Sequence, residues 1–487
     1  MAVTTRTETQ QDLQSFLRYL EENYPDEVLR ISREVDPVFE ATAILWALEN
    51  QRRYPVVIFE NIKGANMPVV TNVHASFPRL ALALGLPFDA TPRDFVLEYM
   101  RREENPIAPV LVDNAQAPCK EIIITGDDVD VTKLPTLKYH ELDSGQVDPG
   151  YEAWQGRYIT LGYDTMKDPE TGVPNVGIYR LQVKGPNKFG IQISETAHGN
   201  YIMKKNIKAG RPTEMAVFTG IHPAVELGCL SFTGIDVDEF SVAGGIIGEP
   251  LEMVKCETID VEVPAHAEIV LECEIHPTER EPEAPFGEYP GTYGPERNNP
   301  VVYVKAITMR KNAVYHSSFV GHRDNLNLSG VTRNSQIYKT CRIASGGVRA
   351  VYVPPSGRSR FICYVQMEKL IEGDPKNAAM AAFTADPFLK YVVVVDEDVD
   401  ITNDSEVWHA IATRVRWDYD AFQVTYSRGS PLDPASYDPA GGSHLVTKVG
   451  IDATRKANYQ PELFTPGVDK VDLDELFGEA WQRTRQD

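Results

Sequence analysis

The stretch PNVGIYRLQVKGPNKFGIQIS, residues 174–194, contains two short β-rich runs, VGIYRLQVKG and FGIQIS, separated by a Pro-Asn turn. Comparable runs recur between about residue 118 and about residue 320: KEIIITG, GRYITLGY, EMAVFTG, AEIVLECEI and VVYVKAITM. Gly, Pro and Asn interrupt them roughly every ten residues, a rhythm that is typical of a β-barrel or a β-sandwich. The sequence therefore predicts a central, barrel-like β domain.

The residues before this β-rich region alternate between helical and extended patterns. Leu13, Phe16, Leu17 and Leu20 are apolar at helical spacing. Asp36 followed by Pro37 predicts an N-cap and a first helical residue, with a helix to about Glu49. Two strands and a further helix are predicted at residues 55–62, 67–73 and 92–103. We expect a small α/β domain here.

The residues after the β-rich region return to an α/β pattern. Strand, helix, strand and helix are predicted at residues 360–367, 375–385, 390–398 and 404–415. This order predicts a parallel strand pair with a right-handed crossover. An amphipathic helix is predicted at residues 471–484, and its apolar face is expected to bury against another subunit.

The 487 residues are too many for one ordinary core. We expect an α+β multidomain protein: an N-terminal α/β domain (1–110), a central split-β-barrel domain (111–320) and a C-terminal α/β oligomerisation domain with a terminal helix (321–487).

Composition excludes several classes of protein. The net charge of −22 and the pI near 5.0 disfavour binding to nucleic acid or anionic membranes. The N-terminus has no signal-peptide pattern, and the longest apolar runs are too short to cross a bilayer. The six cysteines are scattered without a CxxC pair, which favours reduced thiols and a cytoplasmic location.

Two stretches carry candidate chemistry: PNVGIYR, residues 174–180, and EAPFGEYPG, residues 283–291. The second places Glu283 and Glu288 around a Pro-Phe-Gly turn that can bring both carboxyl groups toward one point. One carboxylate held ionised by an arginine, with a second kept protonated, is a common acid–base arrangement. Taken alone, acidic residues beside Pro and Gly are more often solvated turns.

The sequence resembles the UbiD family of decarboxylases, and in particular members that act on aromatic acids such as hydroxybenzoate and vanillate. Further motifs carry the resemblance in family order along nearly the whole chain: DPVFE (36–40), GDDVDVTKLP (126–135), VPAHAEIVLE (263–272), VVDEDVDI (394–401) and WHAIATR (408–414). The resemblance implies reversible, non-oxidative decarboxylation with prenylated FMN and a divalent metal.

The resemblance also implies roles for individual residues. Asn175, His198 and Glu239 would hold Mn²⁺ or Mg²⁺ at the flavin phosphate, with K⁺ as a further cation. Many relatives have Gln before this histidine, whereas this chain has Ala197. The implied cofactor-binding residues are Ile178, Tyr179, Arg180, Ala197, His198, Ser231 and Lys390.

In the implied catalytic group, Arg180 binds the substrate carboxylate, Glu283 positions Arg180, and Glu288 delivers the proton that replaces CO₂. His316, His322 and Arg323 are candidate substrate-pocket residues because the segment 316–330 is expected to border the site. Hydroxybenzoate, vanillate, and indole- or pyrrole-carboxylate stay open as substrates.

The implied partners are a small aromatic acid, CO₂, a flavin prenyltransferase that supplies the cofactor, and further copies of the chain as a dimer or larger homo-oligomer. Two alternatives remain at this point. One is a flavin reductase or oxidase that binds ordinary FMN on a β-barrel. The other is a non-catalytic subunit, although the six metal and catalytic positions are all present.

Overall fold

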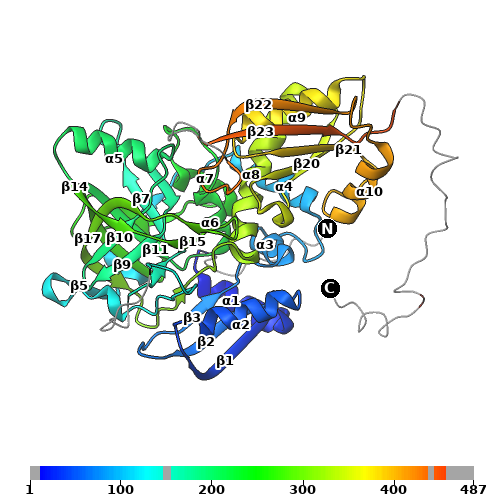
Figure 1. Cartoon of the computed structure of the whole chain (residues 1–487). Coiled ribbons are helices and arrows are strands. Elements are labelled where there is room, and N and C mark those ends of the chain that lie inside the picture. Colours follow the sequence, from blue (N-terminus) through cyan, green and yellow to red (C-terminus); the bar gives the residue numbers. More distant parts are fainter. Residues whose placement is uncertain (1–10, 146–154, 437–443, 457–475, 477–487) are drawn as a thin grey trace.

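The computed structural model describes residues 11–145, 155–436, 444–456 and 476. Three units follow one another along the chain (Figure 1), and the N-terminal one contains a four-stranded sheet. Its strand order is β1-β2-β3-β18: β1 (Val28–Val35), β2 (Val56–Ile62), β3 (Val69–Thr71) and β18 (Tyr315–His316). The strand β18 comes from far along the chain and pairs in parallel with β3. The N-terminal sheet is therefore completed by a later segment.

The N-terminal helices are α1 (Leu13–Asn23), α2 (Glu40–Asn50), α3 (Phe77–Ala83) and α4 (Pro92–Glu103). The four apolar residues predicted to share a face of α1 are all buried. The helix α2 begins at Glu40, so the predicted start at Pro37 is wrong. The Asp36 carboxylate accepts the N–H of Val38, and Val38 bridges to Lys138, which keeps this segment out of the helix.

The central unit is a nine-stranded, largely antiparallel sheet. Its order is β6-β9-β10-β17-β14-β11-β7-β8, with β5 also pairing with β17. The strands are β5 (Ile122–Thr125), β6 (Tyr158–Ile159), β7 (Tyr163–Lys167), β8 (Pro174–Ile178), β9 (Leu181–Gly185), β10 (Lys188–Ile191), β11 (Thr213–Thr219), β14 (Ile269–Glu283) and β17 (Arg297–Met309). Among the described residues the end strands β6 and β8 do not pair, so the β-rich domain is confirmed but the sheet does not close into a barrel.

The helices α5 (His198–Lys208) and α7 (Glu239–Ile247) pack against this sheet, and α6 (Pro223–Cys229) packs against α7. A small sheet of order β13-β12-β4 contains β4 (Val110–Leu111), β12 (Glu252–Lys255) and β13 (Glu262–Pro264). The hairpin of β15 (Phe286–Gly287) and β16 (Tyr293–Gly294) follows β14. This hairpin lies in the stretch that contains Glu283 and Glu288.

The C-terminal unit is a five-stranded sheet of order β19-β20-β21-β23-β22. Its strands are β19 (Val348–Tyr352), β20 (Ile362–Met367), β21 (Tyr391–Asp396), β22 (Ala421–Arg428) and β23 (Leu445–Asp452). Its helices are α8 (Arg323–Ala344), α9 (Asp374–Ala385) and α10 (Asp404–Arg414). The predicted parallel pair is confirmed, because β20 and β21 run parallel and α9 connects them. The predicted terminal helix lies outside the described residues except for Leu476.

The six cysteines are all free, as predicted. The part of the chain that is described contains no helix long and apolar enough to cross a membrane.

Candidate functional site

Arg180 lies between β8 and β9, and its side chain is only 11% exposed. Its Nε and Nη2 donate to the two carboxylate oxygens of Glu283 at 2.8 and 2.9 Å. Its Nη1 donates to Glu288, and its guanidinium lies 5.0 Å from the ring centroid of Phe286. The two stretches that the sequence singled out therefore meet at one arginine.

Glu283 is the last residue of β14 and is fully buried. A buried carboxylate is costly unless it is paired and hydrogen-bonded. Besides Arg180, the Nδ2 of Asn299 donates to Glu283 Oε2 at 2.8 Å and to Gln192 Oε1 at 2.6 Å. Sequence reasoning missed Asn299. The available signal was the polar start of strand β17, where Asn299 lies two positions from Arg297. Arg297 pairs with Glu283 across the ladder.

Glu288 follows β15 and lies inside the hairpin. Its backbone N–H donates to the carbonyl of Thr292 at 2.9 Å, which helps to close the turn. A Cβ at Gly294 would lie 2.9 Å from Glu288 Oε1, so the carboxyl group packs against a residue without a side chain. The turn thus aims the Glu288 side chain back at Arg180.

A cavity of about 1080 Å³ opens beside this group. Ile178, Tyr179, Arg180 and Glu288 lie on its wall, as do residues of α8 and of the C-terminal sheet. The volume is slightly above the range for ligand pockets, roughly 300–1,000 Å³, and fits a large cofactor together with a small substrate. Glu283 lies behind the wall, where it contacts Arg180 but is closed to solvent.

The three residues predicted to bind metal also come together. Asn175 lies on β8, while His198 and Glu239 are the first residues of α5 and α7. Asn175 Nδ2 lies 2.8 Å from Glu239 Oε1 and 3.4 Å from His198 Nδ1. The backbone N–H of Val176 donates to Glu239 Oε2 at 3.3 Å. One amide, one imidazole and one carboxylate therefore converge from three elements.

The chemistry of these three side chains fits a divalent cation. Burial lowers the pKa of His198, which favours the neutral imidazole that a metal requires. Burial raises the pKa of Glu239 to about 7, because no described cation lies close enough to offset the loss of solvation. A bound divalent ion would supply that charge, and mixed N/O ligands suit Mn²⁺ or Mg²⁺.

The other predicted cofactor residues lie around the cavity without lining it. Ala197 is the N-cap residue of α5, next to His198. Ser231 bonds to the hydroxyl of Tyr99 at 2.5 Å, although its two neighbours, Leu230 and Phe232, both reach the wall. Lys390 pairs with Asp433 at 2.8 Å, beside the cavity-lining residue Leu432.

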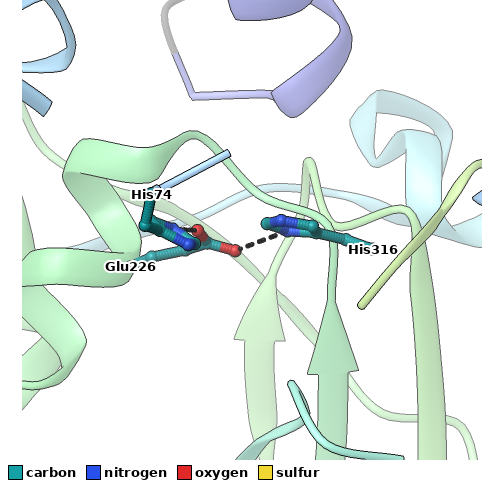
Figure 2. Close-up of side chains that lie close together, drawn as sticks. All are labelled: His74, Glu226 and His316. Carbon is teal, nitrogen blue, oxygen red and sulfur yellow. Dashed lines mark hydrogen bonds and ion pairs between the residues drawn. The ribbon is translucent and has the colours of Figure 1, made fainter. Parts of the chain in front are cut away.

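None of the three predicted substrate-pocket residues lies on the wall of the large cavity. His322 stacks on Phe319 with ring centroids 3.7 Å apart, and its Nδ1 lies 2.9 Å from Glu49 Oε2. Arg323 lies over the ring of Tyr54 at 4.8 Å. His316 is fully buried and contacts Glu226 (Figure 2).

Family models match almost the whole chain in three consecutive parts. They are described as the N-terminal domain, the Rift-related domain and the C-terminal domain of 3-octaprenyl-4-hydroxybenzoate carboxy-lyase, and they match residues 20–98, 110–323 and 326–453. The chain belongs to the UbiD family. This UbiD protein is thus a carboxy-lyase, which disfavours the flavin reductase and oxidase alternative.

Named relatives of this UbiD protein are decarboxylases. It is 34% identical over 431 residues to anhydromevalonate phosphate decarboxylase from Methanothermobacter thermautotrophicus, covering 88% of this chain and 94% of the relative. It is 39% identical to the UbiD-class enzyme HmfF from Pelotomaculum thermopropionicum, solved with FMN (TM-score 0.86; 95% and 99% covered). An evolved dimeric form of HmfF was solved with prFMN. Vanillic acid decarboxylase from Sedimentibacter hydroxybenzoicus is 30% identical (TM-score 0.81; 98% and 99% covered).

Proposed function

We propose that this protein removes CO₂ from an aromatic, heteroaromatic or α,β-unsaturated carboxylic acid with prenylated FMN and a divalent metal. The observation that carries the proposal is Arg180, which two glutamates hold at the wall of a cavity of about 1080 Å³. Asn175, His198 and Glu239 would hold the metal at the cofactor phosphate. When bound, the prenylated flavin supplies the electron sink for the loss of CO₂.

Arg180 binds the carboxylate that will leave. A guanidinium has five N–H groups, and three of those on Arg180 are taken by Glu283 and Glu288. Two remain, one on each terminal nitrogen, and these can bind a carboxylate. Because Glu283 and Asn299 hold the other side of the guanidinium, Arg180 is oriented before the substrate arrives.

Glu288 delivers the proton that takes the place of CO₂. With both glutamates ionised, the group around Arg180 carries one excess negative charge and repels a substrate carboxylate. A proton on Glu288 removes this repulsion and places the acid beside the carbon that loses CO₂. Glu283 positions Arg180 instead, because it accepts hydrogen bonds from both Arg180 and Asn299.

The cavity wall favours a substrate with a second negative group. Arg297, Arg360 and Arg428 line it, and none of them forms an ion pair with a residue that the structure describes. Arg360 lies 5.1 Å from the ring centroid of Tyr289, next to Glu288. In a chain of net charge −22, such arginines form a local site for an anion. A second carboxylate or a phosphate, as in the name of the anhydromevalonate phosphate enzyme, fits this wall.

The test is co-expression with a flavin prenyltransferase, followed by the mass of the bound cofactor and CO₂ release from a panel of unsaturated acids. We expect prenylated FMN and CO₂ release that is lost in Glu283→Gln. Ordinary FMN as the only competent cofactor, together with oxidation of a reduced nicotinamide, would overturn the proposal.

The second negative group is tested on acids with and without a second carboxylate. One charge-assisted hydrogen bond contributes roughly 1.5–3 kcal/mol, or about 10- to 100-fold. In the wild type, we expect acids with a second carboxylate to have a lower KM than acids without one. In Arg360→Gln, we expect this difference in KM to disappear. The matched control is Arg349→Gln, an arginine outside the cavity that pairs with Glu397 at 2.9 Å.

A homo-oligomer formed through the C-terminal unit is also part of the proposal. Large aromatic side chains of this unit are exposed: Trp408, Trp417, Tyr419 and Tyr426 are 62, 61, 77 and 83% accessible. Large apolar side chains that are exposed in one chain gain free energy when a partner subunit covers them. Light scattering that shows only a 54.4 kDa species at micromolar concentration would contradict this assembly.

A further inference from the structure

Two histidines and two carboxylates form a fully buried cluster outside the cavity. His74 follows β3, Glu226 is on α6, His316 is on β18 and Asp324 is in the first turn of α8. All four side chains have zero exposure. Figure 2 shows the two rings on either side of the Glu226 carboxylate. The N-terminal sheet, the central unit and the long helix α8 therefore meet at one polar point.

The geometry of the cluster is that of a ligand set. His74 Nε2 lies 2.5 Å from Glu226 Oε2, and His316 Nδ1 lies 3.1 Å from Glu226 Oε1. One ligand atom from each of the three residues lies within 4.8 Å of the others. Two imidazoles and one carboxylate are a donor set found at protein zinc sites.

Asp324 occupies the position of an outer carboxylate. Its Oδ1 lies 3.4 Å from His74 Nδ1, the nitrogen that faces away from Glu226. The same oxygen accepts the backbone N–H of His74 at 2.7 Å, which fixes the orientation of the residue. A carboxylate on the far nitrogen of a liganding imidazole is the usual outer partner at metal sites.

The charges of the cluster also point to a cation. Glu226 and Asp324 bring two negative charges into a site with no solvent contact, and burying unbalanced charge is costly. A divalent ion bound by the two imidazoles and Glu226 would balance these two negative charges.

We infer that His74, Glu226 and His316 bind a divalent transition-metal ion of the Zn²⁺ type, with Asp324 as the outer partner of His74. This site is separate from the metal proposed at Asn175, His198 and Glu239. Its role is structural, because none of the three side chains is exposed or lies on the cavity wall.

The proposed ion fixes the start of α8. Asn327 of this helix donates to the carbonyl of His74 at 3.0 Å, and Asn325 and Leu328 lie on the cavity wall. The ion would therefore join the N-terminal sheet to the helix that forms part of that wall.

The test is metal analysis in the His198→Ala background, which removes a ligand of the other proposed metal. After dialysis against metal-free buffer, we expect about one equivalent of zinc or a similar metal per chain. Adding Glu226→Gln or His316→Ala should remove it. Adding Glu268→Gln should not, because Glu268 is a fully buried carboxylate that bonds to Gln14 and Arg310 rather than to an imidazole.

A second measurement uses only the wild-type protein, so it does not depend on whether the variants fold. Crystals of the wild-type protein are measured above and below the zinc absorption edge. We expect an anomalous difference peak bounded by His74, Glu226 and His316. An empty position between these side chains, or a metal content that Glu226→Gln leaves unchanged, would overturn the inference, whatever the activity of the enzyme.

Discussion

Replacing Glu288 with Gln tests the proposed proton donor. Gln has nearly the same size, and its oxygen can still accept from Arg180 Nη1, so we expect fold, metal and cofactor to be retained. It has no acidic proton to give. A lost general acid costs roughly 10²–10⁴-fold in turnover, which is about 2.7–5.4 kcal/mol in the barrier. The Glu288 side chain is only 9% exposed, so water has little access to donate the proton in its place. We therefore expect a loss of turnover near the upper end of this range.

The assay is deuterium exchange into the decarboxylated product in D₂O, measured by NMR with cofactor-loaded enzyme. The exchange requires the same group to remove and return the proton, so Glu288→Gln should slow it as much as turnover. The matched control is Glu281→Gln, a glutamate of the same segment that pairs with Lys188 at 2.8 Å, and it should exchange at the wild-type rate. Wild-type exchange in Glu288→Gln would remove Glu288 from the mechanism.

Three further predictions concern neighbouring and distant residues. Arg180→Lys keeps the charge but not the paired bonds to Glu283, so kcat/KM should fall roughly 10- to 100-fold and Tm should drop. Gly294→Ala places a Cβ 2.9 Å from Glu288 Oε1. This variant should lower kcat by about 10²-fold, while its metal content should stay normal. The control is Gly185→Ala, because the added Cβ would meet open space there. Burial raises the pKa of Glu268 from 4.5 to about 7. The folded state thus holds this proton more tightly than the unfolded chain does. The proton's contribution to the free energy of unfolding is therefore complete below pH 4.5 and is lost as the pH rises through about 7. Glu268→Gln should flatten the plot of Tm against pH over this range.

Local patterns in the sequence predicted local structure well. The helix α4 has a capping box between Thr91 and Asp94 and Pro92 in its first turn, so its start follows from three neighbouring residues. The run of valines in β21 predicted a strand buried on both faces, and four of its six residues are buried. These signals depend on a few consecutive residues, which a sequence shows directly.

Contacts between distant segments were harder to predict. The resemblance to the UbiD family predicted that Asn175, His198 and Glu239 form one site, although nothing in their spacing along the chain indicates this. Asn299 was missed because its role comes from the pairing of β14 with β17. His316 was expected at the substrate, yet it contacts Glu226, ninety positions away in the chain.

The closure of the central sheet could not be read from the sequence either. Short β-rich runs separated by turns are expected in barrels, sandwiches and open sheets alike. Whether β6 and β8 pair depends on how the whole sheet twists and on what covers its ends. That information is spread over many strands and is not contained in any one of them.

The pairing of β3 with β18 has a consequence for biosynthesis. The ribosome makes β1, β2 and β3 early, but the strand that covers the free edge of β3 contains Tyr315 and His316. An uncovered strand edge is a template for pairing with other chains. The nascent protein therefore carries an open edge until most of it has been translated, and a fragment that stops before residue 315 keeps that edge. Chaperone demand during synthesis and aggregation of N-terminal fragments are the expected results.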